Sequence, residues 1–149
     1  LLGEDARAGL IDEAVARIEA GDDFDPAIVG FLLEVGRPDT AAAQVVKHRD
    51  RIDGRDWHAW GSVADALREV DQPLAVTCVT RALLVSILDI ARTKAYGHGR
   101  RMWARLITLA DAIDDWHGVE PHAAFGERLY ERHRRKRSFW DKVPSQQRP

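Results

Sequence analysis

Apolar residues recur along most of the chain every three or four positions, which is the period of an amphipathic helix. Runs that alternate apolar and polar residues, as exposed strands do, are nearly absent. The pattern predicts helices over the following ranges: 4–20, 26–35, 40–51, 56–70, 73–93, 98–115 and a seventh that begins at Pro121. The hydrophobic pattern therefore predicts an all-α fold of about seven helices.

Proline, glycine and aspartate mark the ends of these predicted helices. Asp25-Pro26 has the character of an N-cap followed by a first helical residue, Gly36 ends that helix, and Asp53-Gly54 marks a later turn. The turns are short, so neighbouring helices should run antiparallel. Two architectures satisfy this pattern: a stack of helical hairpins of the tetratricopeptide or HEAT type, and a compact bundle.

The predicted helix 73–93 differs from the others because it is apolar on nearly all sides. A helix without a polar face belongs in the middle of a fold, so we expect it to be buried, together with Cys78. Trp57 and Trp60 are three residues apart in the preceding helix, which places both on one face and predicts that both belong to the core. If they were exposed, they would mark a peptide or ligand groove.

Size and composition are those of a single globular domain. With 149 residues, 45% hydrophobic and 31% charged, the chain has enough apolar surface for one core. We expect one helical domain over residues 1–143 and a flexible tail over 144–149, which is rich in Pro, Gln and Arg. The first residue is Leu rather than Met, which suggests part of a longer protein. The lack of a signal-peptide pattern or a membrane-spanning run leads us to expect a cytoplasmic location and no membrane partner.

Charge is distributed unevenly, although the net charge is only −2. Residues 1–91 carry 9 Lys and Arg against 17 Asp and Glu, whereas residues 92–149 carry 13 against 7. The two parts thus have net charges of −8 and +6. This asymmetry favours an anionic partner for the second part, or self-association that pairs the acidic and basic parts. A solvated surface without a partner is the competing interpretation.

The second part contains the strongest candidate binding residues. If the helices 98–115 and 121 onward pack antiparallel, their cations can form one face, comprising Arg100, Arg101, Arg105, Arg128, Arg132, Arg135 and Lys136. Such a face could bind an acidic protein, or a nucleic acid through counterion release. A structural explanation competes with both, because cations stabilise the carbonyl end of a helix and Phe139 and Trp140 could fold back onto the core.

Catalytic patterns are absent from the sequence. There is no nucleophile elbow or phosphate-binding glycine loop, the single cysteine excludes a cysteine-rich zinc site, and no motif indicates a cofactor. Asp111, Asp115 and His117 are weak metal candidates, because carboxylates crowded at one helix end suit a hard divalent cation. A solvated polar helix end explains the same residues. The residues therefore favour a non-catalytic module over an enzyme.

Two segments carry a family resemblance. Ala91-Arg92-Thr93-Lys94-Ala95-Tyr96-Gly97-His98 and the ending Arg132-His133-Arg134-Arg135-Lys136-Arg137-Ser138-Phe139-Trp140 resemble a C-terminal helical module of uncharacterised bacterial proteins. A similar ending occurs in the C-terminal regions of bacterial SWIM zinc-finger proteins. The resemblance covers residues 80–143, and it implies an α-helical, repeat-like accessory domain. The Cys-x-Cys and Cys-x-His ligands of the SWIM finger are absent, so the resemblance implies no zinc function.

The sequence thus predicts a helical protein-interaction module that uses its basic C-terminal part. Nucleic-acid binding through the same residues is the alternative, and a metal-dependent enzyme is a weaker third hypothesis.

Overall fold

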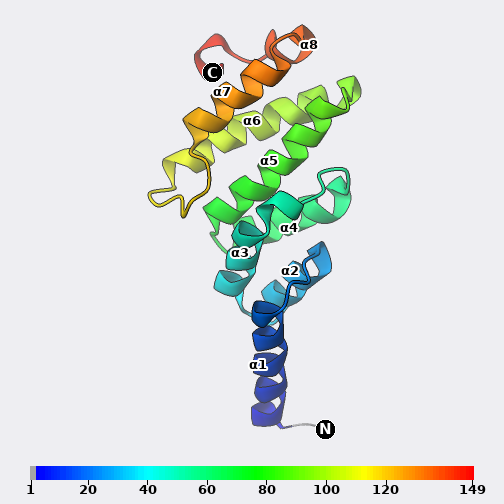
Figure 1. The fold of residues 1–149 in the computed structure, drawn as a ribbon, viewed down its shortest axis with the longest axis vertical. Coiled ribbons are helices and arrows are strands. Elements are labelled where there is room, and N and C mark those ends of the chain that lie inside the picture. Colours follow the sequence, from blue (N-terminus) through cyan, green and yellow to red (C-terminus); the bar gives the residue numbers. More distant parts are fainter. Residues whose placement is uncertain (1–2) are drawn as a thin grey trace.

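The computed structural model describes residues 3–149, and this part of the chain is entirely α-helical, with short 3₁₀ turns and no strands (Figure 1). The prediction of an all-α fold is confirmed. The α-helices are α1 (Glu4–Ala20), α2 (Pro26–Glu34), α3 (Pro38–Lys47), α4 (Trp57–Glu69), α5 (Pro73–Asp89), α6 (Tyr96–Asp111), α7 (His122–His133) and α8 (Arg137–Trp140). The 3₁₀ turns are η1 (Arg49–Arg51), η2 (Thr93–Ala95) and η3 (Ser145–Gln147).

The predicted start and stop signals act where the sequence places them. Asp25 caps α2, because its Oδ1 accepts a hydrogen bond from the backbone N–H of Ile28 at 2.8 Å. Pro38 and Pro73 are the first residues of α3 and α5, where the missing N–H of proline costs no helical hydrogen bond. Gly36 follows α2 with φ +75°, a left-handed conformation that glycine adopts without strain.

The helices pack as successive hairpins. α2 packs against α3, and α4 against α5; the second hairpin then stacks on the first through the pairs α2–α4 and α3–α5. α6 continues the stack by packing along α5, and α7 and α8 cover α6. Figure 1 shows α1 at one end of the long axis and α7 with α8 at the other. The acidic and basic parts of the chain therefore occupy opposite ends of the molecule.

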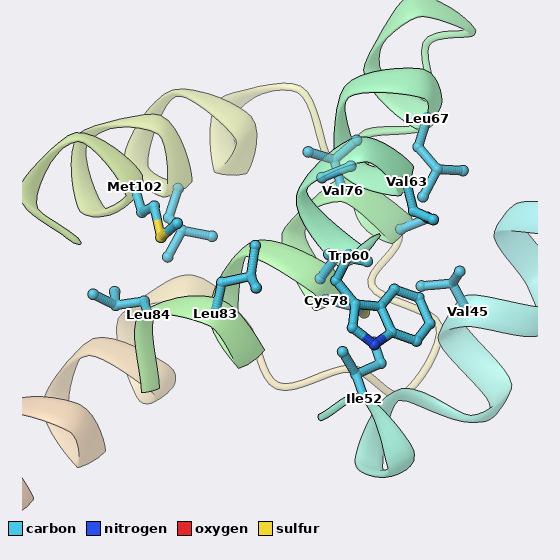
Figure 2. Close-up of a cluster of buried hydrophobic side chains, with 14 of the residues drawn as sticks. Val45, Ile52, Trp60, Val63, Leu67, Val76, Cys78, Leu83, Leu84 and Met102 are labelled. Atoms are coloured by element: carbon cyan, nitrogen blue, oxygen red, sulfur yellow. The ribbon is translucent and has the colours of Figure 1, made fainter. Parts of the chain in front are cut away.

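α5 lies in the middle of this stack, as its apolar sequence predicts. Eleven of its 17 residues are buried. Figure 2 shows the core around it, where Trp60 of α4 lies beside Val45 and Ile52 from the preceding segment. Cys78 is among the buried residues, which confirms the expectation of a buried thiol.

Trp57 corrects one prediction. Its side chain is 54% exposed, whereas that of Trp60 is only 2% exposed. Trp60 stacks on the ring of Phe24 at 5.4 Å, whereas Trp57 is the first residue of α4 and its ring meets that of His58 edge-on. Membership of the same helical face therefore did not bring Trp57 into the core.

Several predicted helix ends were also wrong: α3 ends at Lys47 rather than at Arg51, and α5 at Asp89 rather than at Thr93. The helix expected to reach Asp115 ends at Asp111, and residues 112–121 form a loop without an α-helix. Long-range hydrogen bonds hold this loop: Arg81 Nη1 donates to the carbonyl of Glu120 at 2.6 Å, and Arg49 Nη2 donates to that of Gly118 at 3.3 Å. In addition, the last predicted helix divides into α7 and α8 at residues 134–136.

The C-terminal residues, expected to be flexible, lie against the helices. The indole N–H of Trp103 donates to the carbonyl of Gln147 at 2.9 Å, and Arg148 Nε donates to the carbonyl of Val143 at 2.9 Å. Pro149 lies next to Gly126 of α7. Within residues 3–149, no helix combines the length and hydrophobicity that crossing a membrane requires.

Candidate functional site

The seven predicted binding cations have different neighbours in the structure, although α6 and α7 are in contact. The structure distributes them over three places. Arg101 and Arg105 line a groove between α4 and α6, Arg128 and Arg132 form ion pairs near α5 and α7, and Arg100, Arg135 and Lys136 lie close to the turn between α7 and α8.

Two of the seven cations already have carboxylate partners. Arg128 Nη2 lies 3.0 Å from Glu120 Oε1, and its Nε is 3.2 Å from the same oxygen. Arg132 Nη2 lies 3.2 Å from Asp89 Oδ1. These ion pairs join α7 to the loop before it and to the end of α5, so both arginines have a structural role that the sequence did not reveal.

The groove between α4 and α6 has a volume of about 450 Å³. Its floor contains Leu83 of α5 and Met102 of α6, which Figure 2 shows on neighbouring helices of the core. Gly61 and Ala64 of α4 leave space in the groove, since neither has a long side chain. The remaining lining residues are Trp57, His58, Ser62, Asp65, Thr80, His98, Arg101 and Arg105.

The α6 wall of this groove carries the positive charge. Arg101 and Arg105 are one helical turn apart, and both are exposed. Within the described part of the chain, neither has a carboxylate oxygen within 4 Å; the contact of Arg101 is with Nδ1 of His98, at 3.2 Å. Asp65, the acidic residue of the groove, lies 3.7 Å from Arg68. The groove is therefore electropositive.

Trp57 forms an apolar part of the opposite wall. Its ring stands edge-on to that of His58, with 5.6 Å between the centroids, and more than half of its surface is open to solvent. The sequence-based expectation for an exposed tryptophan was a peptide or ligand groove, and Trp57 does line a groove in the structure. Its position as the first residue of α4 was the sequence signal that could have indicated its exposure.

A second basic surface lies at the turn between α7 and α8, and we call residues 134–137 the basic turn. It consists of Arg134, Arg135, Lys136 and Arg137, of which Arg134 and Arg137 were not in the predicted set. A hollow of about 370 Å³ adjoins it, lined by three of these arginines together with Tyr130, Trp140, Asp141 and Arg148.

Aromatic packing holds the basic turn in place. Phe139 and Trp140 are buried, which confirms that they fold back onto the core. The indole N–H of Trp140 donates to the carbonyl of His133 at 3.0 Å, so it satisfies the end of α7. Arg100 reaches across from α6 to the carbonyl of Ser138 at 3.3 Å. The cations of the turn are thus displayed on a rigid base.

The metal candidates do not form a site. Asp115 Oδ1 accepts a hydrogen bond from the backbone N–H of His117 at 2.9 Å, which makes a local turn. Asp111 lies exposed at the end of α6. Across residues 3–149, no group of three or more His, Cys, Asp or Glu side chains is arranged to hold a metal ion.

Burial also affects two groups that could take part in chemistry. Desolvation raises the pKa of the Cys78 thiol to about 11, so the reactive thiolate is scarce at neutral pH. Desolvation likewise lowers the pKa of His133, and the nearby Lys136 adds to this effect. These shifts are those of structural core residues.

Comparison with known proteins identifies one family. Residues 4–142 match the model of a family of unknown function, DUF6880. No curated protein and no solved structure matches the chain significantly. The comparisons therefore provide no link to SWIM zinc-finger proteins, while they agree with an uncharacterised helical module over most of the chain.

Proposed function

Because the chain belongs to DUF6880, a family of unknown function, we propose its function from its own geometry: it is a non-catalytic interaction module that binds an acidic segment of a partner protein in the groove between α4 and α6. The observation that carries this proposal is the pairing of two arginines that lack carboxylate partners, Arg101 and Arg105, with the exposed Trp57 across the same groove.

The charge of the groove selects the partner. Arg101 and Arg105 are spaced to meet two carboxylates of a segment that runs along α6. In an open groove such contacts accelerate association and exclude basic segments, and salt weakens them. An acidic segment is therefore the ligand that this wall favours.

Trp57 supplies the apolar contact that charge alone does not provide. Tryptophan and arginine are enriched among the residues that dominate binding energy, since a large ring buries much area at little cost in conformational entropy. An acidic segment that also carries an aromatic or aliphatic side chain would place that side chain against Trp57 and Met102. The ligand we propose is thus acidic and amphipathic.

Fluorescence anisotropy with two labelled peptides tests the proposal. The first peptide contains several glutamates and a single phenylalanine. The second peptide is identical except that glutamine replaces every glutamate. We expect the glutamate peptide to bind, and the double variant Arg101→Glu/Arg105→Glu to weaken its affinity by about tenfold or more, which corresponds to about 1.4 kcal/mol. The matched control Arg7→Glu/Arg17→Glu should change affinity little, because both residues are exposed on α1, outside the groove. Equal binding of both peptides, or equal loss in both double variants, would refute the proposal.

The basic turn supports a second candidate function, the binding of nucleic acid. Three of its arginines line a hollow together with the partly exposed ring of Tyr130, a combination of charge and aromatic surface that suits phosphates and bases. A labelled oligonucleotide that binds at physiological salt, and that Arg134→Glu/Arg137→Glu releases while Arg101→Glu/Arg105→Glu does not, would favour this function over the first. Binding confined to low salt would count against it.

A further inference from the structure

Arg81 is the one Lys or Arg side chain that is buried within residues 3–149, with 8% of its surface exposed. It projects from the middle of α5, where its guanidinium lies over two aromatic rings. The guanidinium carbon is 4.4 Å from the ring centroid of Phe125 and 5.3 Å from that of Trp116. Its Nη1 donates to the carbonyl of Glu120. The charge is therefore held in a defined orientation under the loop of residues 112–121.

The other edge of this guanidinium has no protein partner. Nε and Nη2 are both buried, and no atom of the described residues accepts a hydrogen bond from either. Both atoms belong to the edge of the guanidinium group that can bind a carboxylate with two parallel hydrogen bonds. Arg55 uses the same edge on Asp53, with distances of 3.0 and 2.9 Å.

Neighbouring groups leave the charge of Arg81 largely uncompensated. The carboxylate of Glu120 is engaged by Arg128, and Cys78 stays protonated because burial raises the pKa of its thiol to about 11. Asp50 also lines the cavity beside Arg81, but its carboxylate is exposed to solvent. Desolvation lowers the pKa of the Arg81 guanidinium, as expected for a cation without a close counter-ion. A buried charge in this state is unfavourable unless an anion joins it.

A cavity of about 480 Å³ adjoins Arg81, which is within the range of small-ligand sites. Arg49 and Arg128 line it as well, and Ala82, Val85 and Phe125 supply apolar walls. The cavity lies between α5 and the loop that precedes α7, whereas the groove of the proposed function lies between α4 and α6. The two sites are separate, so each stands or fails independently.

We propose that this cavity binds a carboxylate at the guanidinium of Arg81, with Arg49 adding positive charge nearby. Nε and Nη2 are covered in the structure, so the loop of residues 112–121 has to shift for both oxygens to reach that edge. The carboxylate belongs either to a small organic acid or to an acidic residue or C-terminus of a peptide. Apolar parts of the ligand contact Val85 and Phe125. Binding joins α5, the loop and α7, so a bound carboxylate raises the thermal stability of the protein.

Calorimetric and thermal-shift titrations of the full chain test this site, with acetate, succinate, citrate, an acidic peptide and inorganic phosphate as probes. We expect saturable binding of at least one carboxylate probe, and a loss of affinity of about tenfold or more in Arg81→Lys, which keeps the charge but loses the two-pronged edge. The control variant Arg7→Glu/Arg17→Glu, on α1, should bind the small acids with unchanged affinity. The peptide is titrated in the Arg101→Glu/Arg105→Glu background, so that the groove between α4 and α6 does not compete for it. Binding of the small acids would indicate that the carboxylate belongs to a small organic acid. Binding of the peptide alone would indicate that it belongs to a peptide.

Two further measurements keep the test decisive. Arg81→Met should fold and lose the ligand-dependent shift, since an apolar side chain of similar length removes a buried charge. If that variant fails to fold, the Nε–Hε signal of Arg81 in ¹⁵N NMR spectra of the wild type should move on carboxylate addition. No saturable effect of any carboxylate, an equal effect in wild type and Arg81→Lys, or tighter binding of phosphate than of every carboxylate would overturn the proposal.

Discussion

The two parts of the chain use their charged residues differently. Residues 3–91 contain 9 Lys and Arg, and four of these pair with a carboxylate: Arg37, Arg51, Arg55 and Arg68. Residues 92–149 contain 13, of which two, Arg128 and Arg132, have such a partner within the described residues. The basic part therefore displays most of its cations without internal compensation.

Aromatic packing explains how the basic part can do this. Trp140 stands edge-on to Trp103, Tyr130 and Phe139, with ring centroids 4.9–5.9 Å apart. Tyr96 packs edge-on against Phe139 at 5.5 Å. Since these rings hold α6, α7 and α8 together, the cations on the surface are free for another role. In the basic part, the aromatic core therefore stabilises the fold, and most of the surface cations are not needed for that stability.

The largest expected effect concerns the tryptophan that anchors this aromatic core. Trp140→Ala should lower the free energy of unfolding by about 3–5 kcal/mol, because it removes a buried ring and leaves a cavity. Trp57→Ala should cost far less, since more than half of Trp57 is exposed. Urea unfolding followed by circular dichroism measures both. A similar loss for the two variants would contradict the view that aromatic burial, rather than surface contacts, stabilises the basic part.

A second prediction concerns pH. Burial lowers the pKa of His48, His122 and His133 below the ordinary value of 6.5. The unfolded chain then binds more protons than the folded protein, so stability should fall as the pH drops from ~7 to ~5, by at most about 1.4 kcal/mol per pH unit for each histidine. Urea midpoints across this range check the sign. His133→Gln should make the dependence shallower, and stability that stays flat or rises on acidification would contradict the prediction.

The smallest expected effects distinguish paired from unpaired cations. Arg132→Ala removes an ion pair with the partly buried Asp89 and should cost about 0.2–1 kcal/mol. Arg134→Ala, two residues away and without a carboxylate partner, should change stability by less than about 0.5 kcal/mol in either direction. Differential scanning calorimetry at low salt compares the two. A larger cost for Arg134→Ala would mean that the basic turn contributes to folding after all.

Local signals predicted most of the fold. Asp25-Pro26, Gly36 and Pro73 act through their own backbone geometry, so the sequence locates the ends they mark. The apolar run of α5 predicted its central place, because a helix without a polar face is buried on all sides. The early end of α6 was not predictable, because the loop that follows is held by Arg49 and Arg81, which come from distant helices.

The candidate site was predictable only in part. Sequence reasoning identified the basic C-terminal part, but it could not distribute the cations, since the ion pairs of Arg128 and Arg132 depend on how α7 meets Glu120 and Asp89. In the sequence, Arg81 is only a charged residue within the apolar run of α5, and nothing marks it as part of a site. Its surroundings come from Trp116 and Phe125, 35 and more residues later, and no local pattern announces such a contact.

NMR mapping tests directly whether the groove between α4 and α6 receives an acidic segment, as we propose. On titration of ¹⁵N-labelled protein with the glutamate peptide, the indole N–H signal of Trp57 and the amide signals of His98, Arg101 and Arg105 should shift together and saturably. The indole signals of Trp103 and Trp140, which are bonded to carbonyls, should stay in place. Shifts confined to the basic turn, or no saturable shifts, would contradict the account.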